Sequence, residues 1–503
     1  FKTYGTFESY TGFDLPSNVY GESSLADATE IVDNQEQNKE RGANTFDVRL
    51  LSHFSRVQYN YKGKYLLSAV VRRDGSTRFG PNNRFGIFPS GSVGWLVSDE
   101  DFFTNNNVIN FLKFRASYGI IGNDRIGDYR YVSTLAGEAT YVSNEERVFG
   151  KAEGALSNPE IKWEEQVTSN IGLDANLFND AVNLSIDYFV RKTKDLLLSA
   201  QVSGILGASA PGSSAPTVNA GDIENKGLEF LIGYQGNITR DLKMNVSYNF
   251  ATLQNKVLFV ASENGFEQGG GFGIGLEPPS RMAAGEPIGF FYGFETDGVF
   301  QNQAEVNAGP TTDIAPSVGD LRYIDQDDDG DVDLDDRVNI GDPIPDITMG
   351  LNLGFNYKNI DFSSSAFASI GNEIVRNYER NQPFVNRRSA VLDRWIGPNS
   401  SNENPRVSAG ANPNGLFSDY YVEDGSYVRI QNIQIGYTFP DEVLNSMNIK
   451  KLRIYGSVNN VHTFTKYSGY DPSASSGDPI GGGIDQGFYP VPRTFMVGLN
   501  LTF

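Results

Sequence analysis

Residues 325–336 hold the densest group of metal-ligand side chains in the sequence, reading DQDDDGDVDLDD. Their spacing fits a twelve-residue EF-type calcium loop, with Gly330 supplying the sharp turn at position 6. The predicted metal ligands are all aspartates, namely Asp325, Asp327, Asp329, Asp331, Asp333 and Asp336. Asp331 would bind through its carbonyl oxygen, and Asp336 stands at position 12, where glutamate is usual.

The role of such a loop would be structural, because a bound cation removes the electrostatic repulsion among its carboxylates. We expect a structural Ca²⁺ cofactor, with Mg²⁺ as the substitute ion, pinning a long external loop. Weak extracellular calcium sites bind with Kd on the order of 10⁻⁴ to 10⁻³ M. The alternative is a solvated acidic loop that binds nothing specifically.

Catalytic chemistry has little support in the sequence. Cysteine is absent, which excludes thiol catalysis and Cys-based zinc sites, and the two histidines, His53 and His462, lie far apart. Acidic residues are abundant, but none forms a pair on a rigid apolar scaffold that would raise one pKa. We therefore expect no enzyme and assign no catalytic residue.

Charge and hydropathy narrow the class of partner. The 503 residues carry a formal net charge of −21, which argues against nucleic acid because phosphate binding needs clustered Lys and Arg. No apolar run reaches about 18 residues, which excludes transmembrane helices. Transmembrane strands need no such run, so a bilayer partner remains open.

Strict alternation over roughly ten residues recurs along the chain and predicts all-β structure. In 167–190, two alternating stretches flank a turn at Phe178-Asn179-Asp180, which predicts a long hairpin with one apolar and one polar face. Similar alternation occurs in 112–118, 242–250, 349–357 and 495–503. Strands of this length match a tilted span of a bilayer, whereas strands of soluble sandwiches are usually shorter. A transmembrane antiparallel β-barrel is the favoured interpretation, and a large soluble β protein is the alternative.

Loop lengths set the topology, because outer-membrane barrels have short periplasmic turns and long external loops. Short connections are expected at 62–64, 178–180, 236–241 and 358–359, and about fourteen strands follow. The long external segments are roughly 74–90, 121–163, 193–226, 252–345, 371–426 and 460–492. Parity places residues 289–300 inside an external segment, despite their strand-like sequence.

Several aromatic residues fall in these long segments, namely Phe272, Phe290, Phe291, Tyr292, Trp395, Phe417, Tyr420 and Tyr421. They could stack on the rings of a ligand or pack against a partner protein. They could equally pack among the loops themselves. The sequence does not separate these readings, and no substrate-binding residue is assigned.

The sequence resembles the SusC/RagA-type TonB-dependent outer-membrane transporters along nearly its whole length. The matching blocks follow the family's order: 65–103, 112–123 (LKFRASYGIIGN), 158–178, 219–230 (NAGDIENKGLEF), 319–346, 459–472 (NNVHTFTKYSGYDP) and the closing GLNLTF. The resemblance implies a 22-stranded barrel, of which residues 1–503 would be the C-terminal part. On this resemblance, we expect the N-terminal plug, the TonB box and the first strands to lie outside this chain.

The same resemblance implies function, location and partners. It implies active import across the bacterial outer membrane of oligosaccharides or peptides too large for porins, with energy delivered by TonB through the N-terminal region. A SusD-like surface lipoprotein would sit over the mouth as a lid. A passive outer-membrane pore and a surface adhesion or assembly barrel are the alternative functions.

Overall fold

The structure is a computed structural model. It describes residues 2–503 apart from 12, 15–29, 32–39, 104–107, 134–136, 145, 153, 155, 201–213, 263, 273–277, 379–387, 409–411, 445–448 and 474–478. Among the described residues, no helix combines the length and the apolar character needed to cross a membrane.

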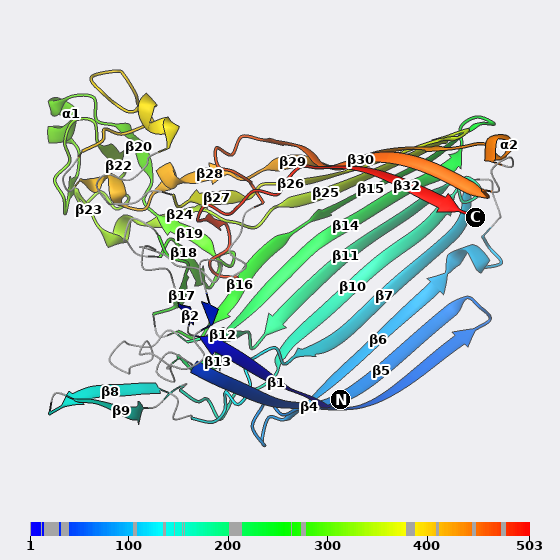
Figure 1. The fold of residues 1–503 in the computed structure, drawn as a ribbon, viewed down its shortest axis with the longest axis horizontal. Coiled ribbons are helices and arrows are strands. Elements are labelled where there is room, and N and C mark those ends of the chain that lie inside the picture. The colour runs from blue at the N-terminus through cyan, green and yellow to red at the C-terminus, as the bar shows by residue number, and fades with distance from the viewer. Residues whose placement is uncertain are drawn as a thin grey trace.

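One large antiparallel sheet, here called the wall, dominates the described chain (Figure 1). Its strands follow one path of neighbours: β1 (Lys2–Thr11), β4 (Glu40–Tyr61), β5 (Tyr65–Ser76), β6 (Phe85–Leu96), β7 (Ile109–Asn123), β10 (Glu164–Leu177), β11 (Val182–Lys194), β14 (Gly221–Asn237), β15 (Leu242–Thr252), β25 (Ile347–Tyr357), β26 (Ile360–Ile370), β29 (Tyr427–Thr438), β30 (Lys451–Thr465) and β32 (Thr494–Thr502). β16 (Gln254–Val260) joins the sheet beside the first half of β14. Fourteen strands on the path agree with the number expected from the alternation.

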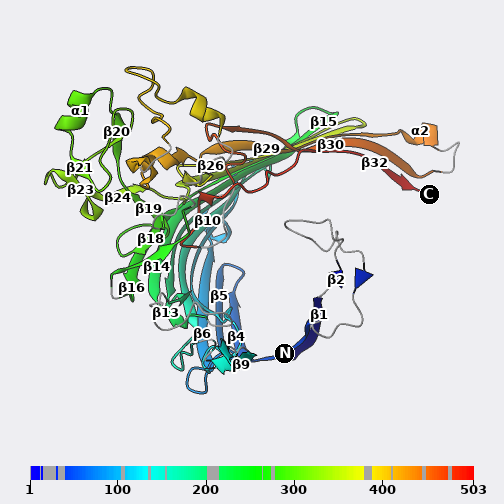
Figure 2. The ribbon, with the colours of Figure 1, turned by 60° about the vertical axis from the view of Figure 1, so that its left-hand side comes forward.

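Strand register turns the alternation of each segment into two continuous faces. Leu173 pairs with Ile186, Ile186 with Phe230, and Phe230 with Phe250, so one apolar row crosses four strands. The polar residues between these positions form the opposite face. Figure 2 shows that the wall curves strongly, as part of a barrel does.

The apolar face has no second layer of described protein over it. Ile171 on β10 is 65% exposed and Val497 on β32 is 87% exposed. Apolar residues at these levels are costly in water but not in lipid. The soluble sandwich, which would bury this face, is therefore excluded for the described wall.

Short turns gather at one edge of the wall, where they were expected. The turns at 62–64 and 178–180 use left-handed backbone, with φ of 55° at Lys62, 72° at Gly63 and 58° at Asn179. Asn60 Oδ1 accepts a hydrogen bond from the N–H of Gly63 at 2.8 Å, which closes the first turn. Two further connections at this edge, at 97–108 and 439–450, contain η3 (Val97–Asp99) and α2 (Asp441–Leu444).

The long segments leave the opposite edge, also as expected, although the first is shorter than predicted. β5 extends to Ser76 and β6 starts at Phe85, so residues 77–84 form a tight loop instead of 74–90. Residues 289–300 contain β19 (Phe290–Gly293) and β20 (Thr296–Val299). Neither belongs to the wall, and each pairs with another strand of the same external segment. Their placement in an external segment is therefore correct.

Further small elements lie in the same segments. Strand pairs are β2 (Phe13–Asp14) with β3 (Glu30–Ile31), β8 (Gly137–Ser143) with β9 (Glu146–Ala152), and β12 (Leu197–Ser199) with β13 (Thr217–Asn219). The segment between β16 and β25 adds β17 (Phe266–Gly269), β18 (Ser280–Ala283), α1 (Gln303–Ala308), β21 (Thr311–Thr312), β22 (Leu321–Tyr323), β23 (Asp331–Val332), η5 (Leu334–Asp336) and β24 (Val338–Gly341). Later segments add β27 (Glu373–Arg376), η6 (Ser389–Asp393), η7 (Pro413–Gly415), η8 (Asp419–Tyr421), β28 (Val422–Asp424) and β31 (Ile484–Asp485).

A lysine at Val246 tests the assignment of the two faces. Val246 lies midway along β15 on the apolar face, whereas its neighbour Asn245 points to the polar face. A lysine at the midplane of a bilayer costs a β-barrel about 2–4 kcal/mol. We expect Val246→Lys to lower the free energy of unfolding in lipid vesicles by that amount, and Asn245→Lys to lower it by less than about 1 kcal/mol. Equal losses in the two variants would contradict the assignment.

Candidate functional site

Three long segments interlock above one edge of the wall into what we call the external module, residues 266–341, 371–426 and 466–493 (Figure 1). β17, β18, β19 and β24 form a four-stranded sheet within the first segment. β27 from the second segment pairs with β28 and, in parallel, with β31 from the third. Phe294 and Ser418 bridge the first and second segments. Because strands from different segments share sheets, the segments hold one another in place.

The module has its own hydrophobic core. One cluster joins all three segments through Phe272, Phe291, Val375, Phe417, Tyr421 and Ile484. A second cluster contains Phe294, Val299, Leu321, Tyr323 and Val332. Of the aromatic residues considered for ligand stacking, Phe272, Phe290, Phe291, Phe417 and Tyr421 are buried. Packing among the loops therefore accounts for these five side chains.

A buried ion pair fixes the first segment to the second. Asp320 is fully buried and receives two hydrogen bonds from Arg406, at 2.7 and 3.1 Å. Asn414 Nδ2 donates a third bond to the same carboxylate at 2.9 Å. A buried carboxylate is tolerated only when it is paired and fully hydrogen-bonded, as Asp320 is.

A second buried carboxylate, Asp485, joins the second and third segments. It accepts hydrogen bonds from the hydroxyls of Tyr378 and Tyr467, the latter at 2.7 Å. The two hydroxyls also lie 2.9 Å apart. Burial, together with the hydrogen bonds to Asp485, raises the pKa of both tyrosines. Both phenols are therefore neutral donors at physiological pH.

The acidic loop lies at the edge of the module, where three of its six predicted ligand residues converge. One carboxylate oxygen each from Asp325, Asp327 and Asp336 lie within 4.8 Å of one another. Gly330 has a φ of +94°, as the sharp turn requires, and Asp328 has a φ of +60°. Asp336 is buried, and its carboxylate accepts the N–H groups of Gln326 at 2.6 Å and Asp333 at 2.8 Å.

The side chains of the other three predicted ligand residues make hydrogen bonds outside this cluster. Asp329 accepts the N–H of Asp331 at 2.8 Å, and Asp331 accepts the hydroxyl of Thr311 at 2.9 Å. Asp333 caps η5 by accepting the N–H of Asp335 at 2.8 Å. The converging carboxylate oxygens are of the donor type that hard cations such as Ca²⁺ prefer. Partial desolvation and the neighbouring carboxylates raise the pKa of Asp327.

Below the module, the polar face of the wall carries a charged network that the sequence analysis missed. Arg115 on β7 pairs with Asp174 on β10 at 3.0 Å and with Asp187 on β11 at 2.5 Å. Ser185 and Asn170 complete the network. The sequence could have predicted this network, because residues of opposite charge occupy polar-face positions of three neighbouring strands.

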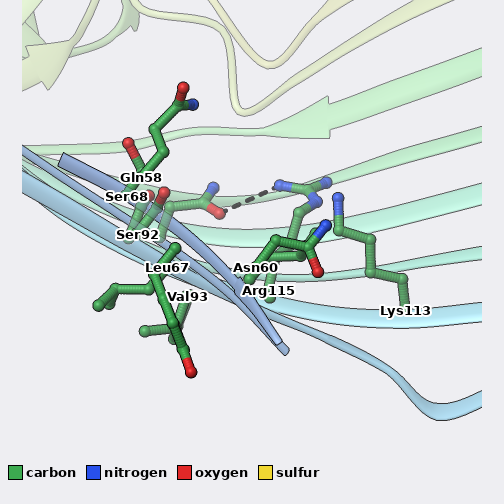
Figure 3. A pocket seen from close by; sticks show the side chains of 14 residues that line it. Gln58, Asn60, Leu67, Ser68, Ser92, Val93, Lys113 and Arg115 are labelled. Atoms are coloured by element: carbon green, nitrogen blue, oxygen red, sulfur yellow. Dashed lines mark hydrogen bonds between the residues drawn. The ribbon is translucent and has the colours of Figure 1, made fainter. Parts of the chain in front are cut away.

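Next to this network the polar face is hollowed, with a volume of about 570 Å³ (Figure 3). Gln58, Asn60, Ser68, Ser92, Lys113 and Arg115 line it. Figure 3 shows Leu67 and Val93 pointing to the other face of the sheet. The lining offers hydroxyl, amide and cationic groups, which can hydrogen-bond a passing polar ligand.

Comparison with known proteins decides the family. A family model described as "TonB dependent receptor-like, beta-barrel" matches residues 2–461. The chain belongs to the TonB-dependent receptor β-barrel family. TonB-dependent receptor P3 of Formosa agariphila is 34% identical over 526 residues, covering 100% of this chain and 51% of that receptor. TonB-dependent receptor SusC of Bacteroides thetaiotaomicron is 31% identical over 471 residues, covering 90% of this chain and 44% of SusC.

Solved structures agree in fold. The structure of the RagAB peptide transporter superposes with a TM-score of 0.77 at 22% identity, covering 95% of this chain and 50% of that one. The RagAB peptide importer in its "open-open" state gives a TM-score of 0.74 over 100% of this chain. The chain spans about half the length of the curated relatives it matches.

These matches confirm the SusC/RagA resemblance, the transmembrane β-barrel fold and the outer-membrane location. The apolar face of the wall is accordingly the lipid-facing one, and the polar face lines the lumen. The short turns lie on the periplasmic side and the external module on the extracellular side.

Two half-buried glutamates in the external module have opposite electrostatic surroundings. Burial and the neighbouring Asp342 raise the pKa of Glu373, whose carboxylate accepts the N–H of Asp342 at 2.9 Å. Burial alone would raise the pKa of Glu423. However, hydrogen bonds from Ser468 and from Arg376, the latter at 2.6 Å, hold it below its usual value.

Glutamine substitutions at these two positions are expected to change stability in opposite directions. The pKa of Glu373 lies above its usual 4.5 in the folded protein, so its ionisation at neutral pH destabilises the fold. Glu373→Gln keeps an acceptor for Asp342 and should raise the free energy of unfolding at pH 7. The gain should be on the order of 1 kcal/mol or less, because the group is partly exposed. It should fade as the pH falls towards 4.5 and the wild-type carboxylate takes up its proton.

Glu423→Gln is the matched variant with the reverse sign. The folded-state pKa of Glu423 is depressed, so its stabilisation is present above about pH 4.5 and is lost below it. This variant should lower the free energy of unfolding at pH 7 by a similar amount. Denaturant titrations at both pH values measure the two effects. A loss of stability in both variants at pH 7 would contradict the assigned surroundings of Glu373.

Proposed function

We propose that this receptor imports oligosaccharides or peptides too large for porins, with energy from TonB and a SusD-like surface lipoprotein over the external module. The superposition on the RagAB peptide transporter, together with the similarity to SusC, carries the proposal. It concerns a whole receptor, because this chain spans about half the length of its relatives.

The external module suits the docking of a partner. Loops this long are usually functional or disordered, and here they form shared sheets and a buried core. A rigid platform costs less entropy on binding than mobile loops do. Exposed apolar side chains remain on it, including Leu392, Ile396 and Tyr470. These side chains offer apolar contact area to a partner protein.

The lumen suits a polar cargo and requires no covalent chemistry. The hollow beside Arg115 presents serine, asparagine and glutamine side chains along with two cations. Sugar hydroxyls and peptide amides can exchange hydrogen bonds along such a surface without being held tightly. Conduction through pores requires this balance between entry and release.

Uptake measurements separate active import from the alternatives. Cells that express the receptor should accumulate the ligand, and deletion of the tonB gene or dissipation of the proton gradient should abolish accumulation. Deletion of the gene for the SusD-like lipoprotein should reduce uptake strongly at low ligand concentration. Uptake that persists without energy would indicate a passive pore. Uptake unaffected by loss of the receptor itself would indicate an adhesion or assembly role.

We propose further that residues 325–336 bind a structural Ca²⁺, for which Mg²⁺ is a weaker substitute. The convergence of Asp325, Asp327 and Asp336 supports this proposal, because three carboxylates at this spacing repel one another without a cation. The loop follows β22 and contains β23 and η5, so an ion would tie these elements together.

Calcium should therefore stabilise the module measurably. At about 10 mM Ca²⁺ and a Kd of 10⁻⁴ to 10⁻³ M, the gain is about 1–3 kcal/mol, and EGTA should reverse it. Asp327→Asn should remove most of this gain. Asp335→Asn changes an exposed acid of the same loop outside the cluster and should retain it. A calcium effect of equal size in both variants would rule out the site.

A further inference from the structure

Lysines gather on the lipid-facing surface of β11, β14 and β16, beyond the extracellular end of the apolar belt. Lys192 on β11 lies opposite Glu224 on β14, and Glu224 lies opposite Lys256 on β16. Lys226 lies two residues from Glu224 on the same face of β14. We call Lys192, Lys226 and Lys256 the lysine row.

The register fixes the outward direction of this row. Ile223 and Val257, each adjacent in sequence to a member of the Glu224–Lys256 pair, point to the other face. There they are buried together with Met282 and Ile480. Since side chains alternate along a strand, Glu224 and Lys256 face outward. Lys256 is exposed, and the Lys192 side chain is 43% exposed.

The row lies at the depth of lipid headgroups. The last row of these strands that is apolar on all three contains Ile171, Tyr188 and Leu228, all of which are exposed on the lipid-facing surface. Further outward, Val190 lies opposite Lys226 and Val167 lies opposite Lys192. Lys226 is two residues beyond Leu228, and Lys192 is four residues beyond Tyr188. At about 3.3 Å per residue and a tilt near 45°, this spacing places the two lysines roughly 5–10 Å beyond the row of Ile171, Tyr188 and Leu228.

The row also carries uncompensated positive charge. Lys192 Nζ lies 2.9 Å from Glu224, so that pair is neutral. In the described part of the chain, neither Lys226 nor Lys256 has a carboxylate within the 4.0 Å of an ion pair. The next row outward holds Glu165, Lys194 and Asp222 and carries a net charge of −1, so the two rows together keep a surplus of one positive charge. In a protein of net charge −21, this surplus of cations on one patch calls for an anionic neighbour.

The lysine row does not continue into the sector formed by β25, β26 and β29. Equivalent lipid-facing positions at the same end of β25, β26 and β29 hold Ile347, Ile370 and Val428, which are apolar. A uniform rim of lysines would reflect only general contact with headgroups. A local row beside an apolar sector indicates a discrete site.

We propose that the lysine row binds the phosphate groups of a lipid in the outer leaflet, with Glu224 holding Lys192 in place. Ammonium groups bind phosphate as point charges, and basic patches at headgroup depth recognise phosphorylated headgroups. A second copy of this chain docking through the same face would bring its own lysines, so charge complementarity favours the lipid. The inference rests on the outer-membrane location and not on the proposed import function.

Binding of diphosphoryl lipid A to the detergent-solubilised receptor, as its gene encodes it, tests the proposal. Native mass spectrometry or a fluorescent lipid analogue gives the dissociation constant. Each lysine near an anionic headgroup strengthens binding about fivefold, so Lys226→Gln/Lys256→Gln should weaken it roughly 20- to 30-fold. The matched control is Lys62→Gln/Lys358→Gln, which removes two charges from exposed turns on the periplasmic side and should leave binding unchanged.

Further arms identify the source of the phosphate. Lipid A without phosphates should bind the wild-type receptor weakly. Its affinity should match that of diphosphoryl lipid A for the Lys226→Gln/Lys256→Gln variant. Inorganic phosphate at millimolar concentration should fail to displace diphosphoryl lipid A. Equal weakening in both double variants, tight binding of dephosphorylated lipid A, or displacement by free phosphate would each overturn the proposal. A change in oligomeric state in Lys226→Gln/Lys256→Gln without a change in lipid affinity would assign the row to an interface between copies, and so would overturn it too.

Discussion

Backbone hydrogen bonding in a solvent that offers no partners is the constraint on which the rest of this structure depends. Within the bilayer each N–H and C=O must be paired by the protein itself, so a spanning strand needs neighbours on both sides. The unbroken antiparallel register from β10 through β11 to β14 meets that demand over 12 or more residues per pair. Once the ladder is fixed, side chains must alternate between lipid and lumen. The composition of each face then follows from its solvent.

The external module solves a different problem with the chemistry of soluble proteins. Its segments lie outside the bilayer, in water that could hydrogen-bond to their backbone groups. Even so, β27 pairs with β31, and the segments pack around Phe291 and Val375. The partly exposed Arg406 pairs with the buried Asp320, whose carboxylate would be costly to bury without a partner. A long loop that is cross-linked in this way can present a fixed surface above a channel. A mobile loop would lose conformational entropy each time a partner docked.

Local pattern was enough to predict the wall but not the module. Alternation in 167–190 and the turn at Phe178-Asn179-Asp180 gave the hairpin of β10 and β11, because one bilayer imposes one period on every strand. The acidic loop was also visible locally, and three of its carboxylates do converge. The ring centroids of Phe272 and Phe417, by contrast, lie 5.0 Å apart although the residues are separated by 145 positions in the sequence. The local sequence around either residue does not predict this contact. Arg115 shows an intermediate case, since its acidic partners follow only after the strand register is known.

Charge in this protein is sorted by compartment, and that sorting links the proposals to the fold. In the lumen, Arg115 lies between the carboxylates of Asp174 and Asp187, so its charge is paired within the wall. Outside, carboxylates concentrate in 325–336, where a divalent cation can neutralise them. On the lipid-facing surface, cations without partners occur where phosphorylated headgroups would lie. The lysine row presents a surplus of positive charge to the headgroups, although the protein as a whole has a net charge of −21.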